Sequence, residues 1–333
     1  MTTTLLDDAM DAEFARIVSE LTRRGFLAGG LGSAALLGLA ACSSSGSSPA
    51  PAATRTVSSV HGTVSVPAAP RRVVSLDSFT MGALYDLGLD PVGVYSAGEE
   101  YVEPQFLARW RKAAKISAGT VGGAIEVEKV AALEPDLILG IDAQKPPYAQ
   151  LRSLAPTVVL PFATTAPWRT VAQATARAVG RGAAFTDLER KLAARAARIK
   201  STHATTLARV TWDVLQGGFD QGSYWLYGPG SPVVDVLTSA GLRLASASKA
   251  TKEQRTVSYE QISLLSDADA VFYYATNAGA PANLGPKLFA NPLFTRLAAA
   301  RSKQLYGSVY FLLTCYSDAL GLLDAFEDAL AKL

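Results

Sequence analysis

The stretch VEKVAALEPDLIL, residues 127–139, contains the complete pattern of one α/β unit. Val127, Val130 and Leu133 fall at helical spacing and therefore share one face of a helix. Pro135 ends that helix, because a proline disfavours the helical backbone conformation of the residue before it. The apolar Leu-Ile-Leu that follows is typical of a strand covered on both faces. The stretch predicts a short helix leading into a buried strand of a parallel sheet.

The same pattern returns later in the chain as YEQISLLSDADAVF, residues 259–272. A helix, an acidic break and an apolar strand follow in the same order, and the second residue is Glu in both copies. A helix end followed by Gly-Leu also occurs twice, in ALYDLGL (residues 83–89) and VLTSAGL (residues 236–242). Two copies of one unit predict two similar lobes.

Length and composition fit this division into lobes. The chain has 333 residues, which is long for a single core and suits two domains. Hydrophobic residues make up 49% and charged residues 18%, so large cores are available. The formal net charge of +2 is too small to indicate nucleic-acid binding. With two cysteines, of which one has a special role described next, there is no disulfide framework.

The N-terminal region has the features of an export signal. Arg23 and Arg24 precede an uncharged stretch, residues 27–41, which is too short for a membrane span and suits a signal sequence. The segment LAAC that ends at Cys42 resembles a bacterial lipobox, which implies that Cys42 is lipidated and becomes the mature N-terminus. The twin arginine favours the route that exports folded proteins, with ordinary secretion as the alternative.

The predicted domain order follows from this signal. We expect a signal peptide over residues 1–41 and, from the Ser-, Gly- and Pro-rich composition after Cys42, a flexible tether over residues 42–70. Within that segment VSSVHGTVSV, residues 57–66, predicts a small hairpin or an edge strand, with His61 at the turn. The protein is expected outside the cytoplasmic membrane and anchored to its surface.

The rest of the body alternates strands and helices at short spacing, which predicts a doubly wound parallel sheet in each lobe. We expect an N-terminal α/β lobe over residues 71–182 and a C-terminal α/β lobe over residues 209–333. Leu188, Leu192, Ala196 and Ile199 lie on one side of a long amphipathic pattern between them. That pattern predicts one connecting helix over residues 183–208.

Five segments, in order, carry a family resemblance. They are RRVVSLDSFTMGALYDLGLDPVGV (71–94), VEKVAALEPDLIL (127–139), YWLYGPGSPVVDVL (224–237), TVSYEQISLLSDADAVFYY (256–274) and NPLFTRLAAARSKQLY (291–306). Together they resemble the class III substrate-binding lipoproteins of ABC importers, which take up ferric siderophores, cobalamin or heme. The resemblance implies two α/β lobes joined by one rigid helix, a ligand cleft between the lobes and little hinge motion.

In such a fold the ligand lies beyond the carboxyl ends of the strands, so the loops after the strands are the predicted cleft walls. The aromatic residues of these loops can either face the ligand or cap the core; they are Phe79, Tyr95, Tyr101, Tyr148, Trp168, Phe219, Tyr310, Phe311 and Tyr316. Lys145, Arg169 and Arg255 are the cations expected to meet the oxygen atoms of a chelate.

The resemblance also implies two permease-docking residues, and the chain departs from the family pattern in one loop. It implies that Glu128 and Glu260, one on each lobe, dock against arginines of the membrane permease, where paired charges give register and association rate. Ferrichrome-type members tend to carry an Arg in the loop before the first unit. Here that loop is GTVGGA, with Val121 near the expected place, so a hydroxamate ligand would be bound differently.

The sequence also bears on other functions. A free-metal receptor needs a His/Asp/Glu set in the cleft, and both histidines lie outside it. Heme with a Tyr ligand, cobalamin, and a lipoprotein for non-transport binding or signalling stay open as alternatives. A hydrolase is disfavoured because there is no G-x-S-x-G motif and no histidine near a post-strand loop.

We therefore expect a monomeric, lipid-anchored receptor that binds a ferric siderophore and hands it to an ABC permease and its ATPase. Iron is then carried as part of the ligand. The expected protein is not an enzyme, with no catalytic residue, no protein-bound metal, no cofactor and no nucleic-acid partner.

Overall fold

The computed structural model describes residues 53–96, 99, 102–117, 123–162 and 167–333. Four predictions concern residues outside this described part: the signal peptide, the lipidation site Cys42, the candidate ligand residue Tyr101, and Val121, which stands where ferrichrome-type members tend to carry an Arg. Ala53–Leu333 forms one unit by its internal contacts.

The described chain begins with a hairpin of two antiparallel strands, β1 (Thr54–Ser59) and β2 (Gly62–Pro67). Gly62 has a φ of +101° at the turn, a conformation that glycine adopts without strain. The predicted hairpin is therefore confirmed. The expectation of a flexible tether through residue 70 is wrong for this segment, because the two strands are paired along their whole length and the backbone N–H of Val60 donates to Val159 O at 2.9 Å.

The N-terminal lobe is built on a five-stranded sheet in the order β5-β4-β3-β6-β7, with every neighbouring pair parallel. Its strands are β3 (Val73–Ser75), β4 (Gly93–Val94), β5 (Ala114–Lys115), β6 (Leu137–Ile141) and β7 (Thr157–Leu160). Its helices are α2 (Ser78–Asp86), α3 (Leu107–Lys112), α4 (Val127–Ala132), the 3-10 turn η2 (Asp142–Gln144), α5 (Tyr148–Leu151) and α6 (Pro167–Val179). Helix α4 and strand β6 confirm the unit predicted from residues 127–139.

The C-terminal lobe has a six-stranded sheet in the order β11-β9-β8-β12-β13, with β10 also paired to β8. Its strands are β8 (Thr211–Gly217), β9 (Ser223–Tyr227), β10 (Arg243–Leu244), β11 (Gln254–Ser258), β12 (Ala270–Tyr274) and β13 (Leu305–Ser308). Strands β8, β12, β13 and β10 are parallel, whereas β9 runs antiparallel to β8 and to β11. This sheet is mixed, so the doubly wound pattern is interrupted by one hairpin.

Short helices connect these strands. They are α9 (Pro232–Ser239), α10 (Ser246–Ala250), the 3-10 helix η3 (Tyr259–Leu265), α11 (Gly285–Phe289), η4 (Phe294–Arg296), α12 (Ala298–Arg301), η5 (Val309–Phe311) and the long α13 (Tyr316–Leu330). The second copy of the unit is present as η3 and β12. Its first part is a 3-10 helix with a kink at Gln261, whereas the corresponding part of the first copy is an α-helix.

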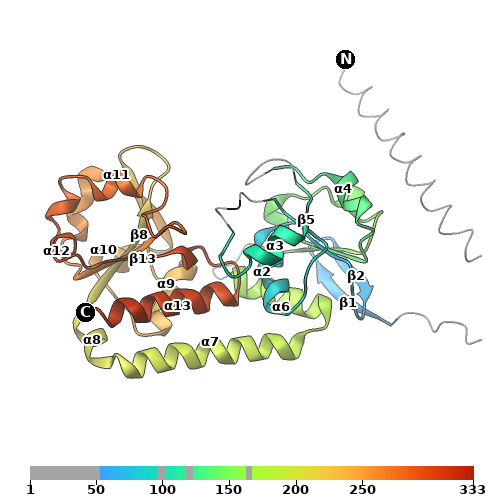
Figure 1. The fold of residues 1–333 in the computed structure, drawn as a ribbon, viewed down its shortest axis with the longest axis horizontal. Helices are drawn as coiled ribbons and strands as arrows, with labels where there is room; N and C mark the ends of the chain where they lie inside the picture. Colours follow the sequence, from blue (N-terminus) through green and yellow to red (C-terminus); the bar gives the residue numbers. More distant parts are fainter. Residues whose placement is uncertain (1–52, 97–98, 100–101, 118–122, 163–166) are drawn as a thin grey trace, which may run out of the picture. The chain divides into compact units, whose positions relative to one another are not determined.

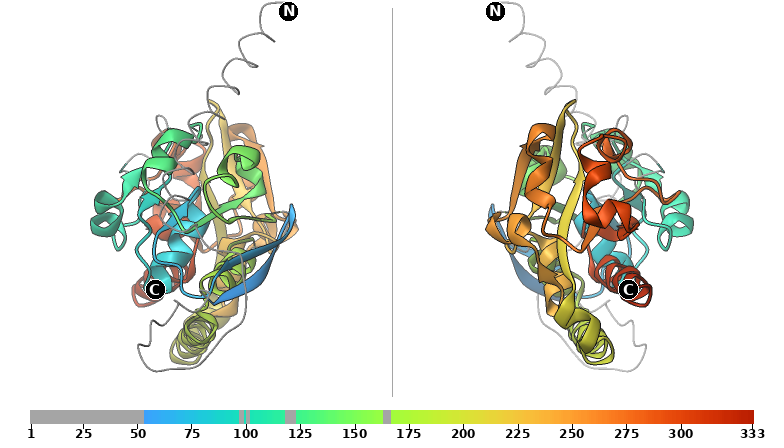
Figure 2. Two further views of the ribbon diagram at one scale, coloured as in Figure 1. Left: turned by 90° about the vertical axis from the view of Figure 1, so that its right-hand side faces the viewer. Right: turned by 90° about the vertical axis from the view of Figure 1, so that its left-hand side faces the viewer.

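The connection between the lobes is α7 (Gly182–Thr202), which lies along one side of both sheets (Figures 1 and 2). It packs against α6 of the N-terminal lobe and against α9 and α13 of the C-terminal lobe. The expected single helix over residues 183–208 is in fact two helices. His203, with φ −108° and ψ 24°, separates α7 from α8 (Ala204–Arg209).

Both lobes contribute to one continuous hydrophobic core. It joins residues such as Leu139 and Trp168 of the N-terminal lobe to Phe272 and Tyr316 of the C-terminal lobe. The rings of Trp168 and Tyr316 meet edge to face at 4.9 Å between centroids, which places one such contact at the boundary between the lobes. A shared, close-packed core opposes independent movement of the lobes. Within the described part of the chain, no helix has the length and apolar character needed to cross a membrane.

Candidate ligand site

The first strand of the N-terminal lobe ends at a buried polar cluster. Asp77 caps α2: its Oδ1 accepts the N–H of Thr80 at 2.8 Å and its Oδ2 accepts the Thr80 hydroxyl at 2.9 Å. Burial raises the pKa of Asp77 to about 6, although these hydrogen bonds oppose the rise. The cap fixes the first turn of α2 and with it the direction of Phe79 at the carboxyl edge of the sheet.

Phe79 forms an aromatic pair with Phe162, which follows strand β7. The ring centroids are 4.6 Å apart in an edge-to-face arrangement, and both side chains are half-buried. Asp142, which follows β6, accepts the backbone N–H of Phe162 at 3.0 Å. Three post-strand segments therefore hold one partly open aromatic surface at the edge where ligands of parallel sheets bind.

The C-terminal lobe also carries aromatic rings at its strand ends. Phe311 packs against Tyr227 and Tyr274, with centroids 5.1 and 5.7 Å apart. Phe219, in the turn after β8, is 64% exposed and meets the edge of Trp225 at 5.1 Å. Phe219 is thus an open apolar face at the carboxyl end of a strand.

The two lobes are joined directly by Asp86 at the end of α2. Its Oδ2 accepts the backbone N–H groups of Tyr316 at 2.7 Å and Ser317 at 3.1 Å, and its Oδ1 accepts the Ser317 hydroxyl. Cys315, at the N-cap of α13, makes no side-chain cap, so a residue of the other lobe caps this helix. A Cβ added at Gly82 would lie 2.9 Å from Cys315 Cβ, so this contact is close-packed.

Several predicted ligand residues belong instead to the packing of the protein. Trp168 and Tyr316 are 0% exposed, Phe311 is 2% exposed and Tyr95 is 7% exposed. Burial raises the pKa of Tyr316 to about 12, so this phenol stays protonated at physiological pH. The prediction that these rings offer an open face to a ligand is corrected, because all four side chains are already buried within the protein.

Two of the three predicted cations are also engaged elsewhere. Arg169 lies 3.4 Å from Asp235 of α9 and stacks over Trp168 at 4.5 Å, so it bridges the lobes. Arg255 lies within strand β11, paired with Leu226 of β9, and not in a loop after a strand. Its positive charge acts on the carboxyl group of Asp213, whose pKa it lowers in opposition to burial. Lys145, by contrast, is exposed in the segment after β6 and has a left-handed backbone with φ of 44°. It is the predicted cation that the structure places at the edge of the sheet.

The remaining predicted residues are two partly covered tyrosines and two exposed glutamates. Tyr148 stacks on His61 of the hairpin at 3.8 Å, so one of its faces is occupied. Tyr310 is half-buried beside α13, close to its Gly321. Glu128, on α4, and Glu260, at the start of η3, are both exposed. Their exposure leaves both carboxylates accessible to another molecule.

The sequence reasoning missed Phe162, Tyr227 and Tyr274. Tyr227 and Tyr274 are the last residues of β9 and β12, and Phe162 comes two residues after β7. The signal was an aromatic residue at or just after a strand end. What sequence could not give is the pairing of each ring with a partner distant in the chain.

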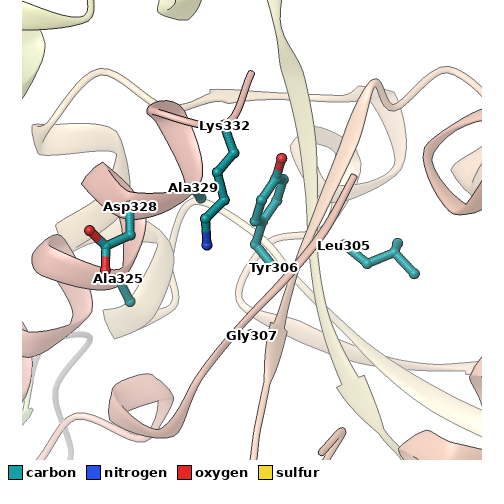
Figure 3. Close-up of a pocket in the computed structure, with 7 residues that line it drawn as sticks. All are labelled: Leu305, Tyr306, Gly307, Ala325, Asp328, Ala329 and Lys332. Atoms are coloured by element: carbon teal, nitrogen blue, oxygen red, sulfur yellow. The ribbon is translucent and has the colours of Figure 1, made fainter. Parts of the chain in front are cut away.

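The described residues form no metal centre, and the pocket nearest in kind to a ligand site is small. Among the described residues, no group of three or more His, Cys, Asp or Glu side chains is arranged to hold a metal ion. Figure 3 shows a pocket of about 220 Å³ between β13 and α13, flanked by Tyr306, Asp328 and Lys332. It is smaller than the roughly 300–1,000 Å³ of ordinary small-molecule sites and lies along the edge strand, away from the post-strand segments.

Comparison with known proteins gives a family match. The model of the family described as "Periplasmic binding protein" matches residues 73–308. The chain is 37% identical over 110 residues to the iron(3+)-hydroxamate-binding protein YxeB of Bacillus subtilis, which is 33% of this chain and 31% of that protein. It is 26% identical to the Fe(3+)-citrate-binding protein YfmC of the same organism, over 76% of this chain and 77% of that protein.

Solved structures agree on the fold. The siderophore periplasmic binding protein from the fuscachelin gene cluster of Thermobifida fusca has a TM-score of 0.69 and 24% identity, over 80% of this chain and 99% of that chain. At this identity the likeness extends to the fold alone. The match to the first three curated relatives spans only 31–39% of their length, so it covers one part of each.

Proposed function

Because this chain belongs to the periplasmic binding protein family, we propose that it is an extracytoplasmic receptor that binds a ferric siderophore and delivers it to an ABC importer. The observation that carries the proposal is the Phe79–Phe162 pair, half-buried at the strand ends of the N-terminal lobe. A ferric chelate presents its organic shell to the protein, so aromatic faces and a few polar donors are sufficient to bind it.

The proposed contact residues are those that remain accessible in the structure. Phe79 and Phe162 supply the apolar face of the N-terminal lobe, and Phe219 supplies one from the C-terminal lobe. Lys145 supplies a cation for chelate oxygen atoms. The names of the relatives, which refer to ferric hydroxamate and ferric citrate, support a ferric chelate over cobalamin or heme.

We place the protein at the outer surface of the cytoplasmic membrane, held by a lipid on Cys42. The lipobox-like LAAC supports this, and so does the name of a relative described as a probable siderophore-binding lipoprotein. The hairpin starts at Thr54, so eleven residues, 43–53, separate the proposed lipid from the body. Such a segment spans at most about 40 Å when fully extended.

The proposed partner is a permease that meets both lobes. Glu128 and Glu260 occupy corresponding positions in the two copies of the unit, and both are exposed. Glu128→Ala combined with Glu260→Ala should abolish uptake of iron by cells while the purified variant binds the chelate normally. Glu253→Ala, also at an exposed glutamate, is the matched control and should leave uptake unchanged. Loss of chelate binding in the double variant would instead place these glutamates in the ligand site.

The ligand itself is identified by titration. The intrinsic tryptophan fluorescence of the full chain in detergent would be followed during addition of a ferric trihydroxamate, a ferric tris-catecholate, ferric citrate, cobalamin or heme. We expect a saturable change with at least one of the three ferric chelates and a weaker or no change with cobalamin and heme. Binding of heme or cobalamin alone would reassign the ligand, and turnover of an acyl ester without any binding would replace the receptor by a hydrolase.

A further inference from the structure

The residue at the start of the central strand is held in the same way in both lobes. In the N-terminal lobe the backbone N–H of Asp136 donates to Arg72 O at 3.1 Å, and Asp136 Oδ1 accepts the N–H of Arg72 at 2.9 Å. In the C-terminal lobe the N–H of Asp269 donates to Thr211 O at 3.0 Å, and Asp269 Oδ2 accepts the N–H of Thr211 at 2.8 Å. Arg72 directly precedes β3 and Thr211 is the first residue of β8, so the two lobes share one construction.

The side chains of Arg72 and Thr211 extend this contact to the end of the helix in each repeated unit. The Arg72 guanidinium donates through Nε to Glu134 O at 2.9 Å and to Leu133 O at 3.0 Å, directly after α4. The Thr211 hydroxyl lies 2.8 Å from Asp269 Oδ2 and 3.2 Å from Asp267 O, two residues after η3. Each side chain therefore links the carboxyl end of one short helix to the central strand of its lobe.

The start of each helix is held by a backbone bond. The N–H of Glu126 donates to Ile116 O at 2.8 Å just before α4, and the N–H of Tyr259 donates to Gly222 O at 2.8 Å at the start of η3. Helix α4 has six residues and η3 has seven. Helices this short are not stable by themselves, so the contacts at their two ends decide how they lie.

The end of α4 also has a strained backbone. Glu134 has a φ of 43°, in the left-handed region that residues other than glycine rarely adopt. Such a conformation persists where the surrounding contacts hold it in place. Here the guanidinium of Arg72 binds the carbonyl group of Glu134, and Asp136 in turn holds the backbone of Arg72. Without the guanidinium this residue can relax, and α4 shifts with it.

Glu128 and Glu260 are exposed and lie in the first turn of these two helices. We propose that Arg72 and Thr211 are positioning residues, which hold α4 and η3 so that the two carboxylates meet the permease at a fixed spacing. The proposal rests on the proposed docking role of the two glutamates. Since paired charges give register and association rate, a displaced carboxylate slows delivery of the chelate and leaves its binding unchanged.

The test is uptake of radioactive iron from the chelate selected by titration, in cells in which each variant replaces the wild-type chain. Arg72→Ala should lower the initial rate of uptake about 3- to 10-fold, while the purified variant binds the chelate as wild type does. Arg71→Ala is the matched control, because Arg71 binds Asp136 through its backbone N–H, which the variant keeps. This control should take up iron at the wild-type rate.

Combined variants separate positioning from a general weakening of the fold. Arg72→Ala should have no further effect in a Glu128→Ala chain, because the carboxylate that it positions is absent, and should still lower uptake in a Glu260→Ala chain. Thr211→Val should show the reverse pattern, and Thr211→Ser, which keeps the hydroxyl group, should retain more uptake than Thr211→Val. Equal losses in both glutamate backgrounds would overturn the positioning role.

The single variants distinguish a failure of the proposal from a failure of the docking function. If Glu128→Ala and Glu260→Ala each take up iron at the wild-type rate, the docking function fails and the positioning role fails with it. If Glu128→Ala loses uptake but Arg72→Ala does not, docking stands and the positioning role alone is overturned. Arg72→Lys serves if Arg72→Ala folds poorly: its ammonium group can still donate to a carbonyl oxygen, so its rate should lie between those of wild type and Glu128→Ala.

Hydrogen exchange measures the contact itself, independently of the permease. The N–H groups of Leu133 and Glu134 donate to Val130 O and Ala131 O at the end of α4. They should exchange faster in purified Arg72→Ala than in Arg71→Ala, because the end of the helix opens more often. Equal exchange in the two variants would show that the guanidinium does not hold α4 and would overturn the proposal.

Discussion

Asp86→Ala removes the acceptor by which one lobe caps the first helix turn of the other. In wild type this carboxylate receives the backbone N–H groups of Tyr316 and Ser317. The N-cap residue of α13, Cys315, supplies no side-chain acceptor of its own. In the variant both N–H groups lose their partner at a close-packed boundary, where water has little access.

The size of the effect follows from these two donors. A buried N–H left without an acceptor costs about 1–3 kcal/mol. Part of this is offset, because burial disfavours the charged form of Asp86, as its raised pKa shows. The net loss should be about 2–4 kcal/mol in the free energy of unfolding. For a folded body of this size that corresponds to a fall of about 3–7 °C in melting temperature.

Differential scanning calorimetry of the full chain near neutral pH measures this fall. Asp90→Ala is the matched control, because Asp90 forms an ion pair with Arg109 and its side chain is 74% exposed. Exposed pairs contribute about 0–1 kcal/mol, so the control should melt within about 2 °C of wild type. If Asp86→Ala melts as the control does, the lobes are not held by this cap. Two separate transitions in wild type would contradict the shared core.

Three other substitutions test particular contacts. Gly82→Ala should destabilise the protein by about 1–3 kcal/mol in denaturant melts, because the new methyl group would lie 2.9 Å from Cys315 Cβ. Gly182→Ala is the control: its methyl group would have no neighbour within 4 Å, so this variant should be as stable as wild type or slightly more stable. Burial raises the pKa of the Asp213 carboxyl to about 6, so wild type should lose on the order of 1–3 kcal/mol of stability as the pH rises from about 4 to about 7. Asp213→Asn should make this pH profile flatter, and a profile equal to that of wild type would refute the reasoning. Phe162→Ala should weaken binding of the ferric chelate identified by titration by about 10-fold, and unchanged affinity would remove the ring from the site.

Much of the fold was accessible from local patterns. The buried strands β6 and β12 follow from short apolar runs, and α4 and α13 follow from apolar residues at helical spacing. The edge strand β11 was missed, because its sequence QRTVS is largely polar and its pairing with β9 is set by tertiary contacts. The end of α7 at His203 was also missed, because nothing in the sequence there breaks a helix.

The site was less accessible from the sequence than the fold. Position after a strand drew attention to Phe79, Phe219 and Lys145, which the structure leaves exposed or half-buried. The same rule selected Trp168 and Tyr316, whose rings fill the contact between the lobes. An aromatic residue after a strand satisfies either role, and the choice depends on which distant residues cover it. That information lies in the packing and not in the spacing.

The most direct test of the proposed receptor function is equilibrium dialysis of the purified full chain against a ferric siderophore labelled with radioactive iron. The chelator is the one selected by titration, and uncomplexed ferric iron is the comparison. Saturable retention of one chelate per chain, with little retention of uncomplexed iron, is the predicted result. Retention of uncomplexed iron alone, or of neither form, would contradict a receptor that binds iron through the organic shell of its ligand.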